Sequence, residues 1–187
     1  MEYGKRVDEG GARDVGPSDA GAEAKGLNGE KDPLIGAVLT DDFRVVKPLG
    51  FGAYARVYLA EQLSVGRRNV ALKILHSVHV KKHGKAAMAA LKREASYLAM
   101  LGSPVFPRIL RTGMTPDGLP FFAMEFVSGQ TLDSVLKTKK TLASEQVVMI
   151  LDAVSDGLSE MHGRDIIHRD LKTGNIVIEE TTPGCLR

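Results

Sequence analysis

The chain contains 187 residues, of which 43% are hydrophobic, and its 25 lysines and arginines against 23 aspartates and glutamates give a formal net charge of +2 at pH 7. This composition suffices for a folded domain, and the nearly balanced charge, without a basic stripe interleaved with aromatic residues, argues against nucleic-acid binding. Because Cys185 is the only cysteine and no hydrophobic run approaches the roughly 20 residues that span a bilayer, we expect a cytoplasmic chain without an internal disulfide or a membrane segment.

Residues 1–33 consist mostly of Gly, Ala, Asp, Glu and Lys, with few large hydrophobic side chains. Burial of so little apolar surface cannot offset the conformational entropy lost on ordering, so we predict a disordered tail over 1–33. The composition changes at Leu34, and we place the folded domain at 34–187.

Five strands and two helices are predicted in this domain. Alternating hydrophobic residues indicate strands at 43–49, 54–60, 69–75, 108–114 and 119–127, the last two joined by a type I turn at 115–118. Between the third and fourth strands, a helical repeat that places Leu91, Ala95 and Leu98 on one face predicts a helix over 85–101. A second helix over 144–161, with Ser144 as its N-cap, opens a helical part of the chain.

A glycine-rich loop connects the first two strands and contains Gly50 and Gly52. Glycines let backbone N–H groups approach phosphate oxygens without interference from a Cβ atom. An ordinary hairpin turn is the simpler interpretation of this loop taken alone. A dinucleotide-binding fold is disfavoured, because a strand rather than a helix follows the glycines.

Lys73 and Glu94 are charged residues at positions expected to face inward. Lys73 shares a strand face with Ala71 and Leu75, and Glu94 falls within the apolar face of the 85–101 helix. Each could instead reach solvent, Lys73 from an edge strand and Glu94 from the margin of the helix face. We predict an ion pair, because each residue supplies the partner that the other needs.

Residues 166–178 read Ile-Ile-His-Arg-Asp-Leu-Lys-Thr-Gly-Asn-Ile-Val-Ile and directly follow the second helix. This segment resembles the catalytic loop of the eukaryotic-type, or Hanks-type, serine/threonine protein kinases, including bacterial members. The glycine-rich loop, residues 70–73 and Glu94 precede it in the order typical of that family. The resemblance implies an α+β fold, with an N-lobe and hinge over 34–127, built on a five-stranded antiparallel sheet and one long helix. The start of a helical C-lobe would occupy 128–187.

The resemblance also implies ATP-dependent phosphorylation of serine or threonine in a protein substrate, with ATP and Mg²⁺ as cofactors. Asp170 would accept or orient the proton of the substrate hydroxyl, and Lys172 would stabilise charge on the transferred phosphate. Asn175 would hold Mg²⁺, while Lys73 and Glu94 would position the nucleotide phosphates. His168 is expected to be structural.

Nucleotide contacts follow from the same resemblance. The backbone of Glu125 and Val127 would meet the adenine edge, and Asp133 would either bind the ribose or cap the next short helix. The implied nucleotide-binding residues are Gly50, Phe51, Gly52, Ala53, Val57, Ala71, Lys73, Glu125, Val127 and Asp133.

Two features depart from the family pattern. Ala55 replaces the third glycine of the loop, and no Asp-Phe-Gly segment occurs between Asn175 and Arg187. We therefore expect a truncated portion of the catalytic domain, inactive or severely impaired by itself. Its 144–161 helix would expose an apolar face for a partner or for the remainder of the C-lobe. The alternative is a non-catalytic nucleotide-binding or regulatory module, similar to a pseudokinase, that ends naturally at residue 187.

Three histidines, His76, His79 and His83, cluster between the third strand and the helix. No cysteine or carboxylate near them completes a metal site, and we interpret Lys81 and Lys82 beside them as part of a solvated loop.

Overall fold

The computed structural model describes residues 32–179. Nearly all of the predicted tail over 1–33 lies outside these described residues. None of the helices in the described range combines the length and the apolar character that a membrane span requires.

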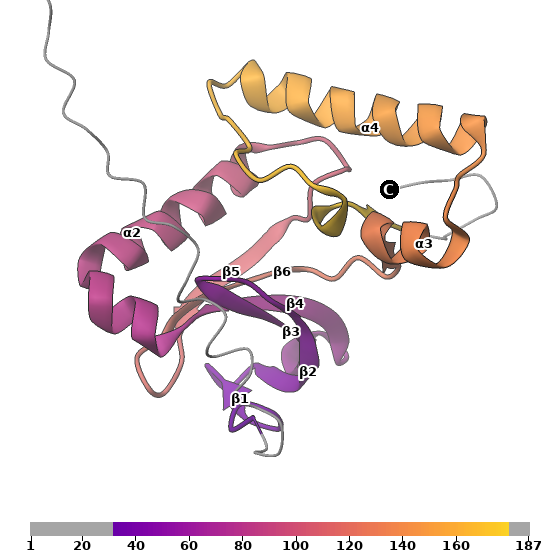
Figure 1. The fold of residues 1–187 in the computed structure, drawn as a ribbon. Helices are drawn as coiled ribbons and strands as arrows, with labels where there is room; N and C mark the ends of the chain where they lie inside the picture. Colours follow the sequence, from indigo (N-terminus) through magenta and orange to yellow (C-terminus); the bar gives the residue numbers. More distant parts are fainter. Residues whose placement is uncertain (1–31, 180–187) are drawn as a thin grey trace, which may run out of the picture. The chain divides into compact units, whose positions relative to one another are not determined.

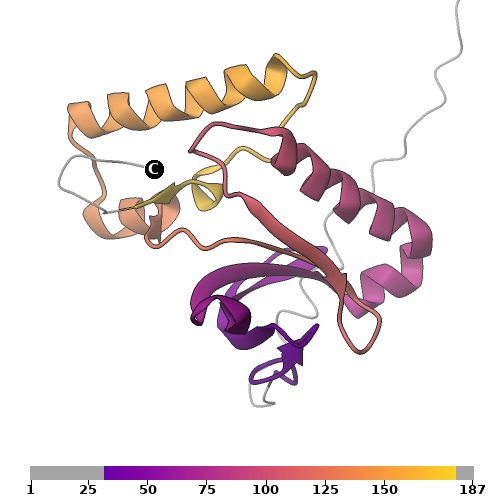
Figure 2. The same ribbon diagram turned by 180° about the vertical axis from the view of Figure 1, so that it is seen from behind.

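A six-stranded antiparallel sheet forms the first part of the fold, with the strand order β1-β2-β3-β4-β6-β5 (Figures 1 and 2). All five predicted strands are present, and β1 is an additional short strand that pairs with β2. The bounds are β1 (Val38–Leu39), β2 (Phe43–Phe51), β3 (Ala55–Gln62), β4 (Arg68–Leu75), β5 (Ile109–Met114) and β6 (Pro120–Glu125), with a short 3-10 helix η1 (Leu63–Val65) after β3.

The two faces of the sheet carry different hydrophobic clusters, because successive side chains of a strand point to opposite sides. On one face, Tyr58, Leu72 and Phe121 are fully buried beneath the segment that contains Leu34 and Ala37. On the other face, Phe122 packs against α2. The alternation that predicted the strands therefore also divides the core into two layers.

Helix α2 (Ser77–Met100) begins earlier than the predicted helix over 85–101. Residues 77–83 form a first helical segment, so the interpretation of Lys81 and Lys82 as a loop is wrong. Gly84, with φ 47° and ψ −122°, separates this segment from the one that carries Glu94. Such a backbone conformation strongly favours glycine, which explains a break at this residue.

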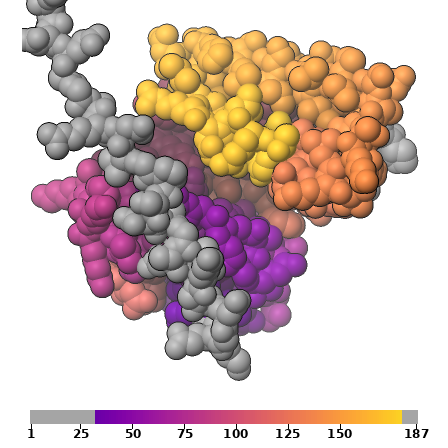
Figure 3. Space-filling view, viewed as in Figure 1, coloured from indigo at the N-terminus to yellow at the C-terminus, as the bar shows by residue number. Residues whose placement is uncertain are grey.

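The remaining elements are β7 (Gln130–Thr131), α3 (Leu132–Lys139), α4 (Ser144–His162), the 3-10 helix η2 (Thr173–Asn175) and β8 (Val177–Ile178), which pairs with β7. The segment after α4, yellow in Figure 3, lies against α3. Helix α4 starts after an N-cap at Ala143, so the prediction of Ser144 as its cap is wrong. The side chain of Gln146 accepts a hydrogen bond from the Ala143 N–H at 3.3 Å, which satisfies the donor of the cap residue itself.

Helix α4 packs closely on the loop that follows α2. A Cβ atom at Gly157 would lie 2.8 Å from Cγ2 of Val105. One turn later, the Glu160 carboxylate accepts hydrogen bonds from the N–H groups of Gly102 at 2.7 Å and Ser103 at 2.8 Å. These bonds lower the pKa of Glu160, with Gly102 contributing most. Elsewhere on α4 the apolar side chains of Val147, Val148, Met149 and Leu151 are exposed.

Candidate active site

A row of candidate residues crosses three neighbouring strands of the sheet. Gly50 on β2 is opposite Val57 on β3, and Val57 is opposite Lys73 on β4. Directly opposed residues of antiparallel strands share a face and lie about 4.5–5.5 Å apart. Ala71, two residues before Lys73 on the same strand, shares that face and is buried. The register thus places the glycine-rich loop, Val57 and Lys73 side by side.

The predicted contact of Lys73 with Glu94 is present. The Nζ atom of Lys73 lies 2.5 Å from Oε1 of Glu94, on the side of the sheet that α2 covers. Buried Leu91 and Ala95 flank Glu94 and fix the orientation of the helix. The side chains of Lys73 and Glu94 are 28% and 43% exposed, so the pair is open to an approaching ligand rather than sealed in the core.

The glycine-rich loop forms a tight hairpin. The Gly52 N–H donates to the Ala55 carbonyl at 2.9 Å, and a Cβ atom at Gly52 would lie only 3.2 Å from that oxygen. Phe51 and Ala53 of the loop are exposed. Ala55 is buried in the hydrophobic cluster under α2, so the methyl group that replaces the family's third glycine has a packing role.

Asp170, Lys172 and Asn175 form a second group. The Lys172 ammonium lies 2.9 Å from both carboxylate oxygens of Asp170, and Nδ2 of Asn175 donates to the Asp170 carboxylate at 3.0 Å and to its backbone oxygen at 2.7 Å. The hydrogen bond from Lys172, followed by that from Asn175, lowers the pKa of Asp170. Asp170 is therefore ionised at neutral pH, and its carboxylate can accept a hydrogen bond from an incoming hydroxyl.

The backbone of this segment is held by local contacts. Nδ1 of half-buried His168 accepts a hydrogen bond from the Asp170 N–H at 3.3 Å, which supports a structural role for that histidine. Arg169 between them has a φ of 62°. A non-glycine residue in the left-handed region carries roughly 1–3 kcal/mol of strain, and such strain is concentrated at functional sites.

Residues of α2, α4 and the catalytic loop line a common cavity of about 230 Å³. Leu98, one turn beyond Glu94, lines it together with His168, Leu171 and Asn175. The carboxyl-terminal part of α2 and the catalytic loop thus border the same space.

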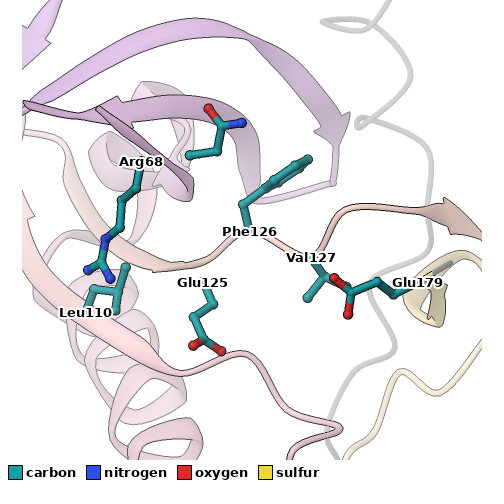
Figure 4. Close-up of a pocket in the computed structure, with 7 residues that line it drawn as sticks. Arg68, Leu110, Glu125, Phe126, Val127 and Glu179 are labelled. Carbon is teal, nitrogen blue, oxygen red and sulfur yellow. The ribbon is translucent and has the colours of Figure 1, made fainter. Parts of the chain in front are cut away.

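The connection after β6 lines a separate pocket of about 230 Å³ (Figure 4). Glu125, Phe126 and Val127 line this pocket with Arg68 of β4. The Glu125 carboxylate accepts a hydrogen bond from the Arg108 N–H at 3.3 Å. The side chain of Glu125 is therefore oriented by Arg108, directly before β5, while its backbone belongs to the predicted hinge.

Asp133 does not cap α3, so that alternative is wrong. Thr131 is the cap and accepts a hydrogen bond from the Ser134 N–H at 3.2 Å. Asp133 lies in the first turn of α3 and forms an ion pair with Lys137 at 2.7 Å.

The structure assembles the predicted residues as two contacting groups, the Lys73 and Glu94 pair and the Asp170 group. Sequence reasoning missed Glu160, which joins α4 to the end of α2 across 58 residues. The sequence places Glu160 three residues after Gly157, on the same side of the helix, but this spacing does not identify a partner for the Glu160 carboxylate.

Comparisons with known proteins agree with this geometry. The family described as "Protein kinase domain" matches residues 43–185. The serine/threonine-protein kinase pkn2 of Myxococcus xanthus is 40% identical over 148 residues, which cover 79% of this chain and 17% of that protein. For pkn3 of the same organism the identity is 35% over 150 residues, covering 80% of this chain and 27% of pkn3. For PknB of Mycobacterium tuberculosis (strain ATCC 25177 / H37Ra) it is 32% over 146 residues, covering 76% of this chain and 23% of PknB.

The chain spans no more than 27% of the length of these relatives. The matched region nevertheless includes the glycine-rich loop, Lys73, Glu94 and the catalytic loop. Protein kinases as a family use ATP and act on proteins. The chain belongs to the protein kinase family and is similar to its bacterial serine/threonine members.

Proposed function

We propose that this chain binds Mg·ATP and supplies catalytic residues for the phosphorylation of serine or threonine in protein substrates. The observation that carries the proposal is the contact of Lys73 with Glu94, because it joins residues 21 apart in the sequence. A partly exposed ammonium held by a helix carboxylate is the arrangement that orients nucleotide phosphates in kinases. The relatives pkn2 and pkn3 are named serine/threonine-protein kinases, in agreement with this assignment.

The nucleotide would lie along the row that Gly50, Val57 and Lys73 form. Glycine N–H groups and the Lys73 ammonium would contact the phosphates, and the small side chain of Ala71 would leave room for the base. Glu125 and Val127 would offer backbone atoms to the adenine edge. The other proposed contacts are Phe51, Gly52, Ala53 and Asp133.

Asp170 would orient the substrate hydroxyl and receive its proton as the phosphoryl group is transferred. Its lowered pKa makes it a weak base, so positioning is its main contribution. The Lys172 ammonium, already 2.9 Å from the carboxylate, would neutralise charge on the transferred phosphate.

Asn175 fits a magnesium site by its chemistry. Nδ2 of its amide donates to Asp170, which leaves Oδ1 as the amide atom available to a hard cation. Mg²⁺ at this residue would neutralise phosphate charge when bound.

Nucleotide binding by the 187-residue chain tests the proposal. A fluorescent ATP analogue is titrated with and without Mg²⁺, and we expect saturable binding that Lys73→Met weakens. Failure of the wild-type chain to bind would overturn the proposal.

Turnover separates the role of Asp170 from binding. The assay uses a polypeptide that contains this sequence and transfers phosphate. In it, Asp170→Asn should lower the rate of phosphoryl transfer by a factor of about 10²–10⁴ without a comparable loss of nucleotide affinity. An unchanged rate would refute the role of Asp170.

A further inference from the structure

The histidines between β4 and Gly84 have no part in the proposed chemistry, yet two of them, His76 and His79, contact the glycine-rich loop. The ring Nε2 of His76 lies 2.9 Å from the Gly52 carbonyl oxygen. The backbone N–H of the same residue donates to the Tyr54 carbonyl at 2.9 Å. One residue before α2 therefore makes two hydrogen bonds to the turn of the loop.

Two tilted ring contacts, with interplanar angles of 47° and 44°, extend this attachment along the first segment of α2. The Tyr54 ring centroid lies 4.7 Å from that of His79, which lies 4.6 Å from that of His83. Tyr54 is 64% exposed, so its ring lies on the helix surface rather than in the core. Pairs at these centroid distances are within the range of favourable aromatic contacts.

The loop is attached at its base as well. Ala55 is buried with Ala87 and Leu91 of the second segment of α2. The glycine-rich loop is thus joined to α2 by its backbone, by the Tyr54 ring and by the Ala55 methyl group. Exposed loops that lack such contacts belong to the least stable parts of a fold.

We propose that His76 and His79, with His83 packed behind His79, position the glycine-rich loop for nucleotide phosphates. The inference rests on the proposed function, since it assumes that this loop binds ATP. His76 and His79 are positioning residues because they hold the loop through its Gly52 carbonyl and its Tyr54 ring, and His83 acts through its contact with His79.

The protonation states follow from the partners. The Gly52 carbonyl can only accept, so Nε2 of His76 carries a proton in this contact. Burial, followed by the charges of His83, His76 and Lys82, lowers the pKa of His79 below its ordinary value of 6.5. The group that faces His79 from the loop is the Tyr54 ring.

Hydrogen–deuterium exchange of residues 50–56 without nucleotide tests the attachment itself. We expect faster exchange in His76→Ala and His79→Ala, by roughly two- to tenfold, as for the loss of one hydrogen bond or ring contact. His76→Gln retains an N–H donor, and His79→Phe retains an aromatic ring beside Tyr54, so both variants should exchange slowly. Exposed His162 at the end of α4 provides the matched control, His162→Ala.

The affinity for the fluorescent ATP analogue at pH 7.5 tests the consequence. We expect His76→Ala and His79→Ala to weaken binding by roughly two- to tenfold, and His76→Gln and His79→Phe to restore it.

The two readouts separate this inference from the proposed function. Unchanged exchange in both alanine variants, or alanine variants that bind the analogue as tightly as the wild type, would overturn the inference. Slow exchange restored by His76→Gln, in a chain that binds no nucleotide, would support the attachment while refuting the proposed function.

Discussion

Replacement of Lys73 by methionine should remove function without removing the fold. The side chains of Lys73 and Glu94 are 28% and 43% exposed, so water already solvates part of both charges. Ion pairs of this kind contribute about 0–1 kcal/mol to stability. The Phe122 ring, whose centroid lies 5.8 Å from the Lys73 ammonium, adds about 0.5–1 kcal/mol.

Methionine retains most of the aliphatic length of lysine and its contact with Phe122. We therefore expect Lys73→Met to lower the free energy of unfolding by less than about 1.5 kcal/mol. Nucleotide binding is affected more, because a charge-assisted hydrogen bond to phosphate is worth about 1.5–3 kcal/mol. The affinity for Mg·ATP should fall by about 10- to 100-fold.

Urea unfolding followed by circular dichroism measures the free energy of unfolding, and titration with a fluorescent ATP analogue measures the nucleotide affinity. Lys92, an exposed lysine of α2, provides the charge-matched control, and Lys92→Met should change neither. A loss of several kcal/mol in Lys73→Met, or an affinity equal to that of the control, would refute the reasoning.

Three further substitutions test helix α4 and the break at Gly84 in helix α2. Gly157→Ala gains about 1 kcal/mol of helix propensity but places a methyl group against Val105, which costs about 1–3 kcal/mol, so urea unfolding should show a net loss of up to about 2 kcal/mol. The lowered pKa of Glu160 means that its stabilising contribution is present above about pH 4.5 and is lost as the pH falls through the folded-state pKa. Urea midpoints measured from pH 7 to pH 3 should therefore fall less steeply in Glu160→Gln than in the wild type. Gly84→Ala meets no atom within 4 Å, so a fall in thermal stability equivalent to about 1–3 kcal/mol would measure backbone strain alone, and an unchanged melting temperature would contradict the assigned conformation.

The sheet and the Lys73 and Glu94 contact could be predicted because both follow from simple periodicities. Alternation places Lys73 on the face that α2 covers, and the helical repeat places Glu94 between buried Leu91 and Ala95. The Asp170 group needed no tertiary information at all, since its members lie within six residues of one another.

The first segment of α2 could not be predicted in the same way. Residues 77–83 contain only Val78 and Val80 as hydrophobic residues, so they show no helical repeat. The contact of His76 with Gly52 joins residues 24 apart and depends on how the loop folds back. Such contacts arise from tertiary packing, which local sequence patterns do not encode.

The register across the sheet has a consequence for tolerance to insertions and deletions. Gly50, Val57 and Lys73 stand opposite one another only while β2, β3 and β4 keep their pairing. One residue added within β3 would turn its following side chains to the other face and bring Tyr58 or Arg56 into the position of Val57. One residue added in the connection at 63–67 would leave the pairing intact. Natural length variation among relatives should therefore be concentrated in that connection and be rare between residues 55 and 62.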